Sequence, residues 1–156
     1  MISLEDIRKS LIKLLHDQFA SAGIRIFGED LEQLRGGEHP GVTENAFPCL
    51  HVQLTPLTSE LAMGADSRNK VVLADITYME ETKTTNAAMY DMEEQLEDVL
   101  GSGFWVRDVY LCIENLNATT ADDLLHVTFQ TEYTRPLPKL EEDIPLFETL
   151  SFGRKE

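Results

Sequence analysis

The sequence has few basic residues for its acidic content. Only 13 Lys and Arg stand against 28 Asp and Glu, which gives a formal net charge of −15. Contacts from Lys and Arg to phosphates provide most non-specific affinity for nucleic acid, so this balance argues against a DNA- or RNA-binding protein. It is compatible with a surface past which DNA slides without sticking, and at least as well with an acidic surface kept for solubility.

Cysteines are scarce as well, and no long hydrophobic run is present. The two cysteines, Cys49 and Cys112, fall in apolar stretches, where a thiol behaves as a small hydrophobic group. Without a recognisable signal peptide, we expect free thiols and a reducing compartment. The apolar N-terminal segment, residues 1–15, contains too many charges for a leader or a membrane span. The sequence predicts a soluble, cytoplasmic protein.

Catalytic motifs are missing too. The chain has no GxGxxG, P-loop, HExxH or GxSxG pattern, and no Cys/His spacing suited to zinc. The histidines fall on separate predicted elements: His16, His39, His51 and His126. His51 and His126 lie on predicted strands and could meet across a sheet, but structural or solvent-facing roles are favoured for both. We predict no catalytic residue, no cofactor site and no metal site.

Two strands in the middle of the sequence organise the rest of the chain. Alternation over Lys70–Met79 places Val72, Ala74, Ile76 and Tyr78 on one face, which is typical of a half-buried strand. Pro48–Leu54 alternates in the same way, and a proline suits the first position of a strand. The segment SELAMGADSR (Ser59–Arg68) between them is predicted to lie in a loop.

Apolar residues recur at spacings of three and four in two further segments, which predicts two amphipathic helices. The first begins after Ser3, whose spacing to Asp6 resembles a capping box, and ends before Gly23. The second follows Thr84 or Thr85 and ends at Gly101. Its two methionines fall in register with the leucines, so they are predicted to fill the core.

Three more strands are predicted, at Ile24–Gly28, Val109–Leu116 and Leu124–Arg135. The element order α-β-β-β-α-β-β predicts an α+β fold, with two helices on one face of a largely antiparallel sheet of about five strands. We assign residues 1–135 to this domain and residues 136–156 to an extended C-terminal arm. The arm is too apolar for an idle tail, so it either folds back on its own domain or docks on a neighbouring molecule. We favour the neighbour because the domain is complete by Arg135.

With these elements in place, the chain resembles the phage tail terminator family, in the form found in phages and prophages with contractile tails. The stretches that carry the resemblance are PCLHV (Pro48–Val52), VLADITYM (Val72–Met79), the acidic second helix and LLHVTFQTEY (Leu124–Tyr133). The resemblance covers most of residues 1–135. The long Gly-rich segment Glu29–Ala46 is where this chain departs from the pattern.

The resemblance implies a structural protein without enzymatic activity, located in the virion tail and assembled in the host cytoplasm. Copies are expected to form a ring, typically a homohexamer, that caps the head-proximal end of the tail tube and stops its polymerisation. The expected partners are the tail tube protein, the sheath and the head-completion or neck proteins. DNA is expected to pass through the ring without specific binding, and no membrane is involved.

We predict that the segment Leu57–Arg68 and the C-terminal arm make the subunit and tube contacts. The predicted interface residues are Leu57, Leu61, Met63, Arg68, Ile144, Leu146, Phe147, Leu150 and Phe152. Four acids of the second helix are predicted to face the channel: Glu93, Glu94, Glu97 and Asp98.

Two alternatives stay open at this point. The chain could be another head–tail connector or neck protein of similar ring architecture, which would differ in the surface that it binds. It could also be a small ligand-binding or enzymatic α+β domain, in which a deep polar pocket gathers His51, His126 or Cys112.

Overall fold

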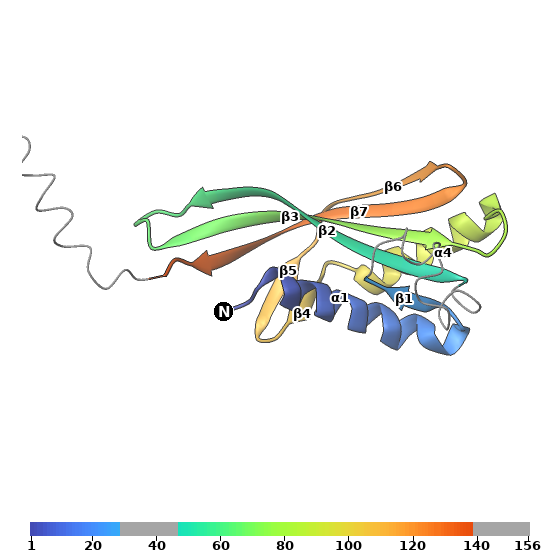
Figure 1. The fold of residues 1–156 in the computed structure, drawn as a ribbon, viewed down its shortest axis with the longest axis horizontal. Coiled ribbons are helices and arrows are strands. Elements are labelled where there is room, and N and C mark those ends of the chain that lie inside the picture. Colours follow the sequence, from blue (N-terminus) through green and yellow to red (C-terminus); the bar gives the residue numbers. More distant parts are fainter. Residues whose placement is uncertain (29–46, 139–156) are drawn as a thin grey trace, which may run out of the picture.

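A computed structural model describes residues 1–28 and 47–138 of the chain, and the structural statements below refer to these residues. Five strands form one sheet, in the spatial order β1 (Arg25–Phe27), β2 (Cys49–Leu61), β3 (Ser67–Met79), β7 (Leu124–Pro136) and β6 (Glu114–Ala121). Only β1 and β2 pair in parallel, and the other neighbours are antiparallel. Two helices, α1 (Leu4–Phe19) and α4 (Asn86–Leu100), pack against this sheet (Figure 1). The predicted α+β fold is confirmed.

Both helices contribute side chains to one hydrophobic cluster with a single face of the sheet. The predicted alternation of the central strand is confirmed, because Val72, Ala74 and Ile76 are 0% exposed and Tyr78 is 6% exposed. Burying apolar surface of this kind is the main favourable contribution to folding. None of the described helices is long and apolar enough to cross a membrane.

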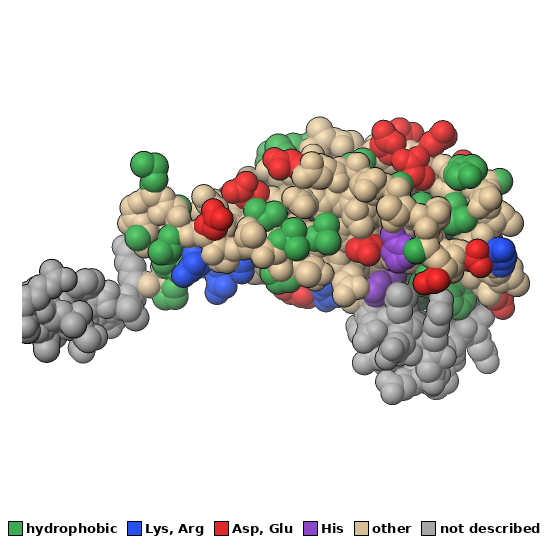
Figure 2. Space-filling model, turned by 90° about the horizontal axis from the view of Figure 1, so that it is seen from above, with side chains coloured by type: hydrophobic (Ala, Val, Ile, Leu, Met, Phe, Trp, Pro, Cys, Tyr) green, Lys and Arg blue, Asp and Glu red, His purple; other side chains and the backbone are tan. Residues whose placement is uncertain are grey.

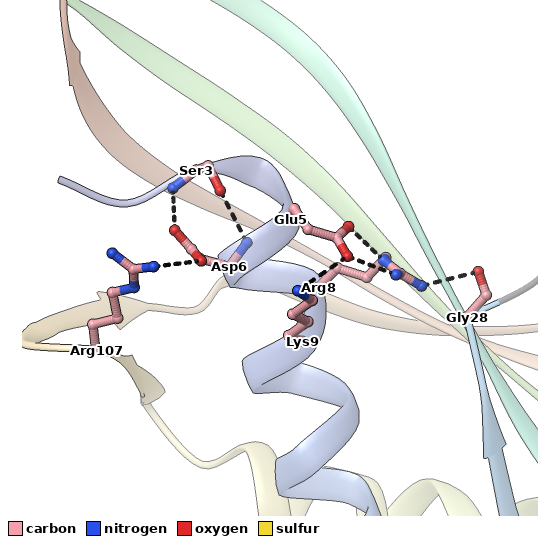
Figure 3. Close-up of polar contacts among 7 residues, drawn as sticks. All are labelled: Ser3, Glu5, Asp6, Arg8, Lys9, Gly28 and Arg107. Atoms are coloured by element: carbon pink, nitrogen blue, oxygen red, sulfur yellow. Dashed lines mark hydrogen bonds and ion pairs between the residues drawn. The ribbon is translucent and has the colours of Figure 1, made fainter.

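The helix boundaries follow the capping chemistry that the sequence predicts. The Ser3 hydroxyl accepts a hydrogen bond from the Asp6 backbone N–H at 3.1 Å, and the Asp6 carboxylate accepts one from the Ser3 N–H at 2.9 Å (Figure 3). A short 3-10 helix, η1 (Ala20–Ala22), follows α1 and ends at Gly23, whose φ of 79° is the left-handed conformation that glycine adopts without strain. At the start of α4, Thr85 accepts a hydrogen bond from the Ala88 N–H at 3.2 Å.

The prediction of a loop over the whole of Ser59–Arg68 is wrong, because only residues 62–66 form the connection. Strand β2 continues to Leu61, and β3 begins at Ser67, with Leu61 directly opposite Arg68. The connection is a tight turn that contains Gly64, with φ 92°. These residues form strands because β3 also pairs with β7 as far as Pro136, and that pairing joins positions far apart in the sequence. Pro136 is the last residue of β7, where the missing N–H does not interrupt the sheet.

The predicted strand Val109–Leu116 is two strands in the structure. Strand β5 (Val109–Cys112) pairs with β4 (Gly103–Val106) in a separate two-stranded sheet, whereas β6 pairs with β7. The chain changes direction near Asn115, which has φ 55° and lies within a register shift of β6. Most of residues 117–123, which lie between the predicted strands Val109–Leu116 and Leu124–Arg135, therefore belong to β6. A Cβ atom at Gly103 would collide with the Leu111 carbonyl oxygen, so this close pairing needs a glycine.

Candidate functional site

The ends of β2, β3 and β7 run beyond the helices as a three-stranded projection, which we call the extension and define as residues 55–61, 67–71 and 131–136. Figure 1 shows it at one end of the long axis, with α4 and the turn between β6 and β7 toward the other end. Strand β2 has a described neighbour on its outer edge only at residues 49–51, and β7 has one only as far as residue 130. Such free strand edges are ready surfaces for another chain.

Three of the predicted interface residues lie on or beside this extension and are exposed. Leu57 is 45% exposed, Leu61 is 55% exposed, and Met63 in the turn is 101% exposed. Leu57 falls within the register shift between Pro56 and Thr58, so it lies at a bulge of β2. Large apolar side chains gathered at one exposed end are typical of an interaction surface.

The fourth described interface residue, Arg68, belongs to a basic face of the extension. Arg68 lies directly opposite Arg135 in the pairing of β3 with β7, and Lys70 follows two residues later on the same face. Arg68 donates a hydrogen bond to the Ser59 carbonyl at 3.2 Å. Figure 2 shows Lys and Arg side chains gathered along the extension. We call Arg68, Lys70 and Arg135 the basic face.

The four predicted channel acids fall into two pairs on α4. Glu93 and Glu97, one turn apart, lie beside β6, where both line a depression with Asn117 and Ala118. Glu94 and Asp98 lie about 100° further around the helix, and both are exposed. Burial raises the pKa of Glu93, and a hydrogen bond with Glu97 and the negative charges of Glu97 and Glu94 raise it further. That these acids face a channel stays a prediction.

Next to Glu93 and Glu94 lies a groove between α4 and the hairpin of β6 and β7. Its volume is about 380 Å³, and its lining residues are Met89, Tyr90, Glu93, Glu94, Ala118, Thr120 and Leu125. Tyr90 is 64% exposed at the rim, although an aromatic side chain of this size usually buries most of its ring. We call this the α4–β6 groove. It combines apolar walls with a cluster of acids.

His51 and His126 lie on strands β2 and β7, on either side of the central strand β3. Thr77 lies opposite both His51 and His126, so the two histidines flank it at a separation of two strand spacings, about 10 Å. His126 Nδ1 is 3.3 Å from an Asp75 oxygen and 3.1 Å from the Thr77 hydroxyl, which itself donates to Asp75 at 3.2 Å. Because both contacts use Nδ1, the ring does not link a hydroxyl to an acid through its two nitrogens, as a catalytic triad requires.

Cys112, which the enzymatic alternative places in one pocket with His51 or His126, lies elsewhere. Its carbonyl accepts a hydrogen bond from the Thr131 hydroxyl at 3.0 Å. Thr131 lies an odd number of positions beyond His126 along β7, so the two side chains point to opposite faces of the sheet. The structure does not bring Cys112 to the histidines. Within residues 1–28 and 47–138, no group of three or more His, Cys, Asp or Glu could hold a metal ion.

Sequence reasoning missed one exposed aromatic surface, on the hairpin of β4 and β5. Trp105 is 65% exposed and Tyr110 is 40% exposed, and their ring centroids lie 5.3 Å apart at an angle of 63°. With Lys13 and Arg107 they border a depression against α1. The alternation of Gly103–Val106 could have predicted this surface. Phe104 and Val106 are buried, so Trp105 between them points outward.

The remaining predicted contacts lie outside the described residues. These are Ile144, Leu146, Phe147, Leu150 and Phe152 of the C-terminal arm. Their role in subunit or tube contacts stays a prediction. His39 and the segment Glu29–Ala46, to which the sequence assigns no contact, also lie outside the described residues.

Comparison with known proteins identifies one family. The sequence model described as "Phage tail terminator protein" matches residues 6–143. No curated protein matches the chain. A solved structure that carries no functional name is similar at 15% sequence identity and a TM-score of 0.46, and the similarity covers 90% of this chain and 100% of that chain.

Proposed function

The chain belongs to the phage tail terminator family, and from this premise we propose that its copies close into a ring on the head-proximal end of the tail tube. Family membership makes it a structural component of a phage tail that interacts with other tail components. In the proposed role, a hexameric ring ends polymerisation of the tube and offers its other surface to the head-completion or neck proteins.

The observation that carries the proposal is the exposed extension. It holds Leu57, Leu61 and the neighbouring Met63 away from the body of the chain, where they are 45%, 55% and 101% exposed. A contact between this end and a different surface of a second copy is heterologous, and such contacts close into a ring when the rotation between copies permits. The extension therefore supplies one half of a repeating contact.

The charge of the chain supports passage of DNA through the ring. A net charge of −15 repels a polyanion, so DNA would slide past the wall without adhering. Of the predicted channel acids, we assign Asp98 to this wall because it is exposed and does not line the α4–β6 groove.

The experiment is to add purified protein to growing tail tubes and to examine the mixture by electron microscopy. We expect a ring at one end of each tube and shorter tubes as the protein concentration rises. A tube length that does not depend on the protein would contradict the proposal. Binding to heads with no binding to tubes would favour a connector or neck protein instead.

The C-terminal arm, residues 136–156, is proposed to dock on a neighbouring molecule, and residues 1–135 to form the domain. The described part of the chain suggests where to cut it, because the Leu137 N–H still donates to the Asp66 carbonyl at 2.9 Å. A chain that ends after Pro138 keeps this bond. We expect it to form smaller assemblies by light scattering, and an unchanged mass would remove the arm from the interface.

A further inference from the structure

We propose that the basic face of the extension in one copy binds the α4–β6 groove of the next copy. This contact rests on the proposed ring and names the two surfaces that repeat around it. The groove is occupied by a second copy of this chain, because the basic face and the groove carry opposite charges.

The basic face lacks acidic partners of its own. Arg68 and Arg135 lie directly opposite each other across two strands, an arrangement of like charges that destabilises a sheet. Among the described Lys and Arg residues, only Arg25 and the three of the basic face have no acid within ion-pair distance. In a chain with 28 acids, three unpaired cations on one strand face indicate that their partners come from another molecule.

Cations on the body of the chain behave differently. Arg8 donates to Glu5 at 2.8 Å, and Arg107 lies 3.2 Å from Asp6 (Figure 3). Lys13 and Lys83 lie 2.7 Å and 3.6 Å from Asp17 and Asp123. These body cations already lie beside acids of the same chain, whereas the cations of the basic face do not. An acidic surface of another molecule would therefore form more new ion pairs at the basic face.

The α4–β6 groove carries the opposite charge and the same kind of internal repulsion. Glu93 lines the groove, and Glu97, one helical turn further along, lines the depression that adjoins it. Like charges at this spacing destabilise a helix. Burial raises the pKa of Glu93, and the hydrogen bond with Glu97 and its negative charge raise it further. Cations placed between them would remove this repulsion. The exposed ring of Tyr90 and the apolar wall at Leu125 would then receive apolar side chains such as Leu61, which lies beside Arg68.

Charge also decides between the two grooves that could receive the extension. The depression beside Trp105 and Tyr110 is bordered by Lys13 and Arg107, and both of these cations already lie beside acids. It offers the basic face no unpaired carboxylate. The α4–β6 groove does, and Figure 1 shows α4 and the turn between β6 and β7 toward the end of the molecule opposite the extension. Surfaces at opposite ends of one chain suit a head-to-tail contact.

The test uses two charge-reversal variants of the full chain. One carries Arg68→Glu with Arg135→Glu on the basic face, and the other carries Glu93→Lys in the groove with Glu97→Lys in the depression that adjoins it. A control, Lys9→Glu with Lys13→Glu, changes the net charge as much as the first variant at two positions on α1 that are 71% and 76% exposed. Thermal melting reports whether each variant folds, and light scattering gives the mass of the assembly, alone and on tail tubes.

We expect each reversal to weaken self-association about 10- to 100-fold, because like charges then face each other in every contact. The control is expected to assemble as the natural chain does. Mixing the two variants should restore the assembly, because an alternating ring pairs an acidic extension with a basic groove and the reverse. High salt should also weaken the natural assembly, as the screening length falls from about 10 Å at 0.1 M to about 3 Å at 1 M.

The outcomes separate this contact from the ring itself. Reversed variants that assemble like the natural chain, a control that fails, or a folded mixture that does not recover would overturn the contact and leave the ring standing. A natural chain that stays a monomer both alone and on tubes would overturn the ring and the contact with it. A restored assembly with the mass of a dimer would support the contact and overturn the ring.

Discussion

Replacing two apolar residues near the tip of the extension should weaken assembly strongly without unfolding the chain. The variant is Leu61→Thr with Met63→Ser, in which threonine keeps the preference of residue 61 for a strand. Leu61 is 55% exposed and Met63 is 101% exposed in the single chain. Surface substitutions of this kind change the free energy of unfolding by about 0.5 kcal/mol or less. The melting temperature should therefore stay close to that of the natural chain.

The effect on association should be much larger. Burying a Leu or Met side chain contributes about 1.5–3 kcal/mol, and Leu61 already has nearly half of its surface covered. The two substitutions should then remove about 2–4 kcal/mol from each contact between copies. Since about 1.4 kcal/mol corresponds to a tenfold change in Kd, the Kd of each contact should rise about 30- to 700-fold.

Light scattering over a range of concentrations, with thermal melting in parallel, checks both expectations. Val109→Thr is the matched control, because Val109 is 36% exposed and belongs to β5, outside the extension. Leu11→Ala is the opposite control, because Leu11 is 0% exposed and its loss should lower stability by about 2–5 kcal/mol. The reasoning is refuted if the double variant assembles at the same concentration as the natural chain, or if it melts as early as Leu11→Ala.

Three further predictions concern the stability of the single chain. Ser3→Ala removes the cap that accepts the Asp6 N–H and should cost about 1 kcal/mol, seen as a lower denaturant midpoint with an unchanged slope. Phe129→Ala removes a side chain that is 1% exposed and packs edge-to-face on Phe104; chemical denaturation should show a loss of about 3–5 kcal/mol, and a loss below 1 kcal/mol would contradict the assigned packing. The raised pKa of Glu93 means that the folded chain holds this proton more tightly than the unfolded chain, so stability falls as pH rises through that pKa. Glu93→Gln should therefore melt above the natural chain at neutral pH, and the difference should vanish well below the ordinary value of 4.5.

The sequence predicted the elements in which one face is buried. Leu11 and Leu15 recur on one side of a helix, and Val72 and Ala74 alternate along a strand, because burial repeats with the period of the backbone. The capping box at Ser3 was equally readable, since it joins positions only three residues apart. Local signals of this kind do not depend on where the rest of the chain lies.

The strands of the extension and β6 could not be predicted from the sequence in this way. Residues 57–61 and 118–121 are exposed, so their side chains show no burial pattern, and polar residues suggest a loop. They are strands because their backbone groups pair with β3 and β7, whose residues are distant in the sequence. Local propensity is a weak guide where such pairing decides the conformation.

The sequence by itself therefore determined the fold class, the core and the family resemblance, because each depends on order and periodicity along the chain. Only the tertiary structure decided which charges meet. The opposition of Arg68 and Arg135 follows from strand register, and the position of Glu93 and Glu97 beside Asn117 and Ala118 follows from the packing of α4 beside β6. Electrostatic interactions act through space and weaken with distance, so a repulsion between residues 67 positions apart has no trace in the sequence until the strands pair.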